Sequence, residues 1–217
     1  MIEAVLWDFG GVITTSPFEA FNRFEAQHHI PKDFIRGINA THPETNAWAR
    51  FESSQVTLEE FDKLFFEETS KAGYPIAGRE VLELLSGDVR PKMVGVLKEC
   101  KRHFKIGCIT NNVSAGHGPA MVQTNERAAE IQKIMDLFDV IVESSKEGIR
   151  KPNPEIYRIA MSRLNVPAER IVFLDDLGIN LKPARELGMK TIKVMDEKQA
   201  IKDLEKITGL NFKNISD

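Results

Sequence analysis

Short apolar runs alternate along this chain with longer stretches of helical period, and this alternation restricts the possible folds more than any other feature. The runs are rich in β-branched residues, as is typical of buried strands. The expected strands are Ile2–Trp7, Lys105–Thr110, Val140–Glu143, Ile171–Leu174 and Thr191–Val194. Strands that alternate with helices predict an α/β fold, a three-layer α/β/α core in which helices cover both faces of a parallel sheet.

One interval departs from this alternation. From Thr14 to about Arg90 no strand is predicted, and apolar residues recur only at helical spacing. Most of the 13 phenylalanines lie there. They indicate the core of a small helical bundle, with an apolar substrate pocket as the alternative. The sequence therefore predicts two domains: a core of residues 1–14 and 91–217, and an inserted helical cap of residues 15–90.

The charge balance argues against a polyanionic partner. The chain has 29 Lys and Arg against 32 Asp and Glu, a net charge of -3, and no run of like charges that would bind nucleic acid. No stretch approaches the roughly eighteen apolar residues of a membrane span, and no basic leader begins the chain. We therefore expect a cytoplasmic protein without membrane insertion. Its oligomeric state stays open.

Polar residues follow the expected strands at the point where each strand ends. Asp8 follows the first, Thr110, Asn111 and Asn112 follow the second, and the pair Asp175 and Asp176 follows the fourth, while Lys151 precedes the helix after the third. The carboxyl ends of parallel strands share one edge of the sheet, and ligands bind there. We therefore expect these side chains to converge on one site.

This set of residues has the chemistry of phosphoryl transfer. Three clustered carboxylates repel one another unless a cation lies among them, and oxygen ligands suit Mg²⁺, which is commonly shared with a phosphate. Lys151 can neutralise an anionic nucleophile, while Thr110 and backbone N–H groups near Asn111 and Asn112 can hold phosphoryl oxygens. The sequence predicts magnesium as cofactor and a small phosphorylated molecule as substrate.

These residues resemble the motifs of the haloacid dehalogenase-like hydrolases, in the subfamily with a helical cap inserted after the first motif. The resemblance covers nearly the whole chain and implies a Rossmann-like core. It is closest in residues 171–194, which are similar to the N-terminal phosphatase domain of the soluble epoxide hydrolases. Residues 147–157 and 109–112 are similar to the same group.

The resemblance assigns a metal site and a nucleophile. Asp8 would become a phosphoaspartate and would bind magnesium through its other oxygen. Gly10 would offer its backbone carbonyl to the metal. Asp176 would bind the metal directly, and Asp175 would bind it directly or through water.

The resemblance also assigns the phosphate-binding residues. Thr110 and Asn111 would bind the phosphoryl group, and Lys151 would balance its charge. Asn112 and Asn180 would support the site. Specificity would come from the cap and from the loop 113–124.

Gly10 departs from the family pattern. Phosphatases of the family usually carry a second aspartate at this position, which protonates the leaving oxygen and then activates water. Such a general acid and base is worth typically ~10²–10⁴ in rate. A water molecule, the substrate or a cap side chain such as Glu52 could supply the proton instead.

Three hypotheses follow from the sequence. The first is a magnesium-dependent phosphatase acting on a small or lipid-like phosphomonoester. The second is a catalytically weak or regulatory member that binds magnesium and phosphate, which Gly10 supports. The third is a haloacid dehalogenase, in which Asp8 would attack a halogen-bearing carbon without a metal. The pair Asp175 and Asp176 favours the first over the third, because a metal site requires it and a halide displacement does not.

Overall fold

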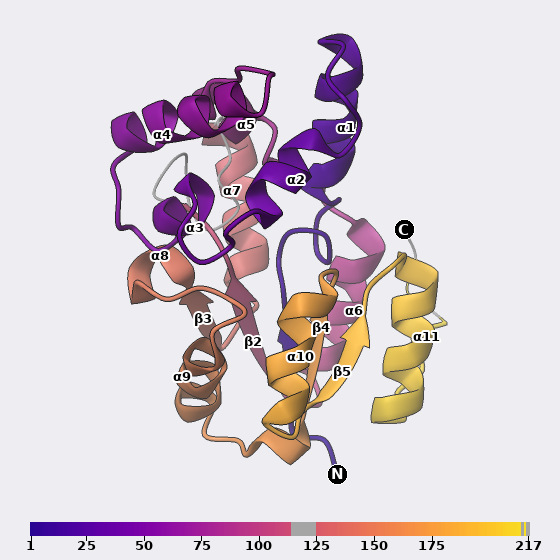
Figure 1. The fold of residues 1–217 in the computed structure, drawn as a ribbon. Coiled ribbons are helices and arrows are strands. Elements are labelled where there is room, and N and C mark those ends of the chain that lie inside the picture. Colours follow the sequence, from indigo (N-terminus) through magenta and orange to yellow (C-terminus); the bar gives the residue numbers. More distant parts are fainter. Residues whose placement is uncertain (114–124, 214, 216–217) are drawn as a thin grey trace.

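A five-stranded parallel sheet forms the centre of the computed structural model, which describes residues 1–113, 125–213 and 215 (Figure 1). The strand order is β3-β2-β1-β4-β5, and every neighbouring pair is parallel. The strands are β1 (Ala4–Trp7), β2 (Lys105–Thr110), β3 (Val140–Glu143), β4 (Ile171–Asp175) and β5 (Lys190–Lys193). The predicted sheet is confirmed, and the first strand begins two residues later than expected.

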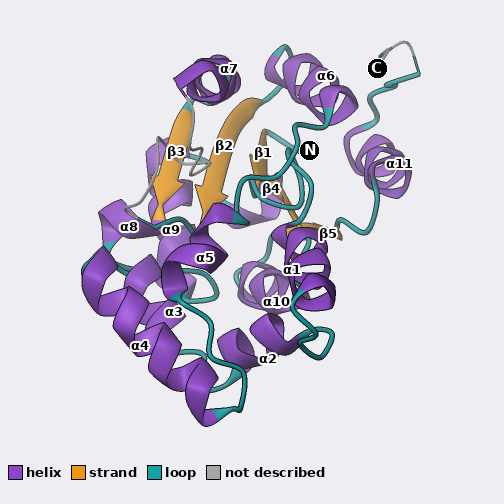
Figure 2. Ribbon diagram, turned by 90° about the horizontal axis from the view of Figure 1, so that it is seen from above, coloured by secondary structure: helices purple, strands orange, loops and turns teal. Residues whose placement is uncertain are grey.

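Helices cover both faces of the sheet, as Figure 2 shows. On one face, α6 (Pro91–Lys101), α7 (Asn125–Met135) and α11 (Glu197–Thr208) share an apolar cluster that includes Val5 and Trp7 of β1. On the other face, α9 (Pro154–Leu164) and α10 (Gly178–Glu186) share an apolar cluster that includes Ala4 and Leu6. The short helix α8 (Ser144–Glu147) follows β3, and a 3-10 turn (Ala168–Arg170) precedes β4. Strands buried on both faces explain the continuous apolar runs of the sequence.

Local signals set the ends of the crossover helices. Pro154 opens α9, and the Asn153 side chain caps it by accepting a hydrogen bond from the Glu155 N–H at 3.0 Å. Gly188, at φ 104°, follows α10 in a conformation that favours glycine.

Five helices lie between β1 and α6. They are α1 (Pro17–Gln27), α2 (Phe34–Ala40), α3 (Ala47–Glu52), α4 (Leu58–Lys71) and α5 (Gly78–Glu83). We call residues 15–90 the helical insert; it lies beyond the carboxyl ends of the strands (Figure 1). Whether it is a separate domain that acts as a cap stays a prediction.

The insert has an apolar core of its own. Phe21, Phe51, Phe61 and Phe65 are buried together with Trp48, and the rings of Phe51 and Phe61 stack with centroids 4.5 Å apart. The interpretation of the phenylalanines as a bundle core therefore matches the structure.

Two further features concern the thiols and the length of the helices. The cysteines Cys100 and Cys108 are free and buried, and burial raises the pKa of the Cys100 thiol to about 12. In the described part of the chain, no helix has both the length and the apolar character needed to cross a membrane.

Candidate active site

Three carboxylates meet at the carboxyl ends of β1 and β4. Because Trp7 pairs with Leu174, Asp8 comes to lie beside Asp175, and the Asp8 N–H donates to the Leu174 carbonyl at 2.8 Å. One carboxylate oxygen each of Asp8, Asp175 and Asp176 lies within 4.8 Å of the others. The residues that the sequence places at one edge of the sheet are thus close together.

Lys151 lies between two of these carboxylates. Its Nζ is 2.9 Å from Asp8 Oδ1 and donates to Asp175 Oδ2 at 2.8 Å, and the side chain is only 1% exposed. Burial by itself would lower the pKa of Lys151, but the charges of Asp175 and Asp8 outweigh it and raise that pKa. Lys151 is therefore a permanent cation within the cluster.

The cluster nevertheless holds more negative than positive charge. Burial raises the pKa of Asp8 well above its ordinary value, against the opposing charge of Lys151, and the charges of Asp175 and Asp176 raise it further. Burial, and then the charge of Asp175, raises the pKa of Asp176 to about 6. Because two carboxylates resist ionisation, the site favours a divalent cation that would neutralise them.

Asp175 is held in one orientation by a network of donors. The Leu177 N–H donates to Oδ1 at 2.8 Å, and Asn180 Nδ2 lies 3.1 Å from both oxygens. The Asn180 carbonyl in turn accepts a hydrogen bond of 2.6 Å from the buried Tyr157 hydroxyl. Asn180 thus contacts the acidic cluster, and the supporting role that the resemblance implies for it stays a prediction.

Asn111 holds the backbone of Lys151. Its Oδ1 accepts from the Lys151 N–H at 2.8 Å, and its Nδ2 donates to the Lys151 carbonyl at 3.0 Å. These contacts link the end of β2 to the segment that carries the lysine, and the sequence did not predict them. They engage the side-chain amide, so the phosphate contact expected of Asn111 stays a prediction.

Thr110 and Asn112 flank Asn111 and are both buried. Asn112 Nδ2 donates to Glu143 Oε2 at 2.8 Å, and its Oδ1 accepts from the Ser145 hydroxyl at 2.9 Å. Asn112 therefore fixes the loop after β2 to the end of β3.

Two adjacent glycines in the turn after β1 have opposite surroundings. A Cβ atom built at Gly10 would meet no atom within 4 Å, whereas one at Gly11 would lie 2.3 Å from Asp176 Oδ2. Gly11 also has a φ of +75°, in the left-handed region. Gly11 is thus a site residue that the sequence analysis missed, although the pair of glycines was its signal.

We expect Gly11→Ala to destabilise the protein by about 1–3 kcal/mol, because the new methyl group adds backbone strain and displaces Asp176. Gly10→Ala is the matched control, since its Cβ would lie in open space at an ordinary φ. Thermal unfolding of both variants measures the difference. Equal melting temperatures would contradict the close approach of Gly11 to Asp176.

Glu52, named above as a proton source, is paired with a core residue. Its Oε2 lies 2.6 Å from Arg150 Nε, and Arg150 Nη1 donates to the Pro43 carbonyl at 2.8 Å. The Ser54 hydroxyl donates to the Ser145 carbonyl at 2.7 Å. These contacts join the insert to Arg150 and to α8, and the first of them engages the Glu52 carboxylate.

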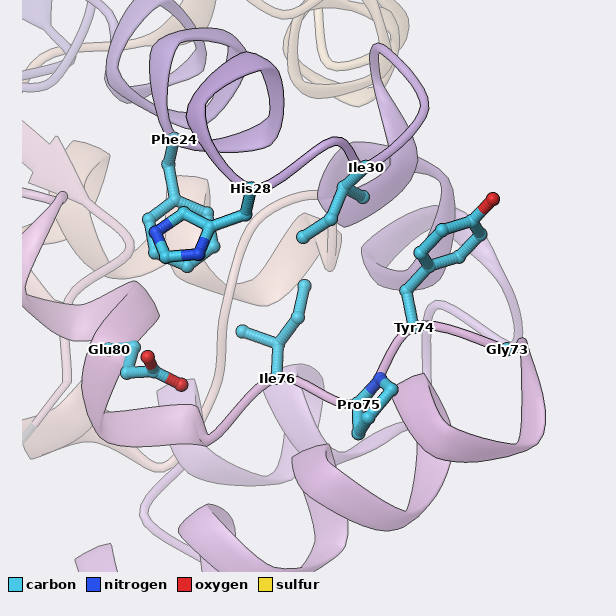
Figure 3. Close-up of a pocket in the computed structure, with 8 residues that line it drawn as sticks. All are labelled: Phe24, His28, Ile30, Gly73, Tyr74, Pro75, Ile76 and Glu80. Carbon is cyan, nitrogen blue, oxygen red and sulfur yellow. The ribbon is translucent and has the colours of Figure 1, made fainter.

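A cavity of about 220 Å³ lies within the insert (Figure 3), and no residue of the acidic cluster lines it. Its lining comes from the end of α1 and from the segment around the start of α5: Phe24, His28, Ile30, Gly73, Tyr74, Pro75, Ile76 and Glu80. The rings of Phe24 and His28 stack at one side of it. Of the predicted specificity loop 113–124, only Val113 is among the described residues, and it packs on the core of the insert.

Known proteins match this chain over most of its length. The model of the haloacid dehalogenase-like hydrolase family matches residues 2–188. The chain is 33% identical to acyl-CoA dehydrogenase family member 10 of Mus musculus, over 95% of this chain and 19% of that protein. It is 27% identical to bifunctional epoxide hydrolase 2 of Mus musculus, over 97% of this chain and 40% of that protein. The chain therefore spans less than half of either relative.

Other similar proteins match over nearly their full length. Sesquiterpene phosphatase astK of Aspergillus oryzae is 27% identical, over 95% of this chain and 97% of that protein. A predicted HAD-like family hydrolase from Porphyromonas gingivalis has a TM-score of 0.68 at 19% identity, covering 97% of this chain and all of that chain. The HAD family enzyme bt-2542 of Bacteroides thetaiotaomicron, in complex with magnesium and inorganic phosphate, has a TM-score of 0.58 at 18% identity and covers 91% of this chain and 97% of that chain. At these identities the two structures show a shared fold.

Proposed function

This chain belongs to the haloacid dehalogenase-like hydrolases, and on that premise we propose that it is a magnesium-dependent phosphatase acting on a small or lipid-like phosphomonoester. The observation that carries the proposal is the cluster of Asp8, Asp175 and half-buried Asp176, in which Lys151 pairs with the first two. A relative named as a phosphatase, which this chain matches over nearly its full length, supports the same reaction.

The residues present fit a magnesium ion. The side-chain donors are all carboxylate oxygens, and the single buried lysine beside them contacts only Asp8 and Asp175. Asp8 and Asp176 would each give one oxygen, Gly10 would give its carbonyl, and Asp175 would complete the set directly or through water. The bound ion would neutralise the cluster and polarise the phosphoryl oxygens.

The side chains of the site then have separate tasks. Asp8 attacks phosphorus, so that a bond from its oxygen to phosphorus forms while the bond to the ester oxygen breaks, and the alcohol leaves with a proton taken from water. Lys151 stays charged beside Asp8 and offsets the negative charge that accumulates. Thr110 and the Asn111 backbone N–H hold the phosphoryl oxygens, because the Asn112 N–H already donates to the Ser144 hydroxyl at 3.0 Å. Water then hydrolyses the phosphoaspartate, and phosphate leaves.

The test is phosphate release from a panel of phosphomonoesters that includes an activated aryl phosphate, measured with magnesium and with a chelator. Asp8→Asn is the control, because it removes the nucleophile and keeps the size of the side chain. Release that requires both magnesium and Asp8 supports the proposal. Rates equal to those of Asp8→Asn on every ester would overturn it.

Gly10 favours a second candidate, a regulatory member that binds magnesium and a phosphorylated ligand without useful turnover. The glycine offers no acid or base at the position where family phosphatases usually carry one. Magnesium binding together with the absence of Asp8-dependent release on every ester would select this candidate. Halide release in the presence of a chelator would select the dehalogenase hypothesis.

We expect magnesium to stabilise the protein more at pH 7.5 than at pH 5. The pKa of Asp176 is about 6 in the native state against an ordinary value of 3.8. Between these pH values, Asp176 therefore keeps its proton in the native state and has lost it in the unfolded state. Without metal, this group therefore lowers the stability as the pH rises from about 4 to 6. Magnesium requires the ionised carboxylates, so its effect grows over the same range and reaches about 2.7 kcal/mol at a hundredfold excess over Kd.

Melting temperatures with and without magnesium across this pH range measure the effect. Asp176→Asn is the control, since it removes a titrating ligand and should flatten the pH dependence. A magnesium effect of the same size at both pH values would contradict the prediction.

A further inference from the structure

The two segments that connect the helical insert to the sheet pair with each other. Thr14 and Val89 form an antiparallel bridge. The Thr15 N–H donates to the Asp88 carbonyl at 2.8 Å, and the Arg90 N–H donates to the Ile13 carbonyl at 2.9 Å. We call residues 12–16 and 87–90 the paired linkers. Because they are hydrogen-bonded to each other, a shift in one linker is transmitted to the other.

The paired linkers reach the acidic cluster by one direct contact and one indirect contact. The Ser16 hydroxyl donates a hydrogen bond to Asp176 Oδ2 at 3.2 Å. On the other linker, Arg90 Nη1 donates to the Gly11 carbonyl at 3.0 Å. Gly11 is the residue whose backbone lies against the carboxylate of Asp176. Both linkers therefore reach the same carboxylate, one directly and the other through Gly11.

Asp176 depends on Ser16 for its orientation more than the other carboxylates depend on any single donor. Asp8 is held by Lys151 and by the Phe9 N–H, which donates to Asp8 Oδ1 at 2.7 Å. Asp175 is held by several donors, as described above. Within the described ranges, Ser16 is the only side chain that donates a hydrogen bond to the Asp176 carboxylate.

The Ser16 hydroxyl does not cap α1, although Ser16 occupies the N-cap position of this helix. Ser16 directly precedes α1 with the extended backbone of an N-cap residue, where a serine side chain ordinarily accepts a hydrogen bond from the first turn. Here the side chain makes no capping hydrogen bond. Its hydroxyl donates to Asp176 instead, so its position points to a role in the site as well as in the helix.

We propose that Ser16 is a positioning residue for the metal site: its hydroxyl holds Asp176 Oδ2 so that Oδ1 faces a divalent cation, and it thereby couples the cation to the paired linkers of the insert. This inference rests on the proposed function, because it requires that magnesium binds at the cluster. Coupling of this kind is reciprocal, so magnesium should also order the paired linkers.

The first test measures magnesium affinity by isothermal titration calorimetry, with magnesium chloride and the unliganded protein. Ser16→Ala should weaken the affinity roughly tenfold, the effect of one hydrogen bond to a charged group. Ser16→Thr keeps the hydroxyl and should stay within about threefold of the wild type. Ser16→Gly restores a good N-cap without the hydroxyl, so it should be as weak as Ser16→Ala.

A matched control removes an N-cap elsewhere in the insert. The Thr57 hydroxyl accepts from the Glu60 N–H at 3.2 Å at the start of α4. Thr57→Ala should lower the melting temperature and leave the magnesium affinity unchanged. If Ser16→Gly bound magnesium like the wild type, Ser16 would be only a helix cap. If Ser16→Ala bound like the wild type, the inference would fail while the proposed function stood.

The second test is hydrogen exchange at the amides of Thr15 and Arg90, which are bonded across the paired linkers. Magnesium should slow their exchange in the wild type and have no such effect in Ser16→Ala. Slowing that persists in Ser16→Ala would overturn the coupling. If the wild type bound no magnesium at all, the proposed function and this inference would fall together.

Discussion

Gly10→Asp is expected to raise kcat for an alkyl phosphate roughly 10²-fold. The substitution supplies a carboxyl group that can protonate the leaving oxygen and then activate water, functions worth typically ~10²–10⁴ in rate. The backbone accepts it, because a Cβ at Gly10 meets no atom within 4 Å and the φ of this residue lies outside the left-handed region. The new carboxyl would lie two residues after Asp8, in the position that family phosphatases usually fill with aspartate.

The gain should depend on the leaving group. The aryloxide that leaves an aryl phosphate is a weak base and needs little protonation. Formation of the phosphoaspartate from an aryl phosphate should therefore change less than its formation from an alkyl phosphate. Steady-state rates for one ester of each kind, at saturating magnesium, measure the difference. Gly10→Asn is the matched control, because it has nearly the same size and no acid or base.

Two outcomes would contradict this prediction. If Gly10→Asn gained as much as Gly10→Asp, the effect would come from packing and not from proton transfer. If Gly10→Asp bound magnesium normally and turned over no faster than the wild type, another group would already serve as acid and base. A magnesium titration of each variant separates these results from a damaged metal site.

The core fold could be predicted because its signals are local and repeated. Each buried strand forms an apolar run, and the helices between strands show one apolar face, so the order of elements predicts the parallel sheet. The convergence of Asp8, Asp175 and Lys151 follows from the topology, since the carboxyl ends of parallel strands share one edge. The order of the strands alone therefore predicts that these three side chains lie close together.

The contacts of the polar residues could not be predicted in the same way. The sequence around Asn111 predicts only a loop. Its two hydrogen bonds to the Lys151 backbone form only because β2 and the segment before α9 lie side by side. The sequence around Ser16 predicts a helix cap. Its hydrogen bond to Asp176 joins two residues that are 160 positions apart in the sequence. Hydrogen bonds of this kind depend on the packed structure, whereas propensity and periodicity report on neighbours in sequence.

Lys151→Met is expected to destabilise the metal-free protein by about 3–5 kcal/mol at pH 7.5, the typical cost of removing one partner from a buried ion pair. The Lys151 side chain is 1% exposed and lies between Asp8 and Asp175, so the substitution leaves both carboxylates without a cation. Denaturant unfolding in the presence of a chelator measures the loss. Lys182→Met is the matched control, because that side chain is 76% exposed and should lose little.

A second substitution identifies the cause. If the loss comes from uncompensated charge, then Asp8→Asn added to Lys151→Met should recover a substantial part of the stability, because it removes one of the two stranded carboxylates. If the loss came from the packing of the lysine stem, the double variant would be as unstable as Lys151→Met or worse. Magnesium should also stabilise Lys151→Met more than it stabilises the wild type, since the ion would then be the only cation among the three carboxylates.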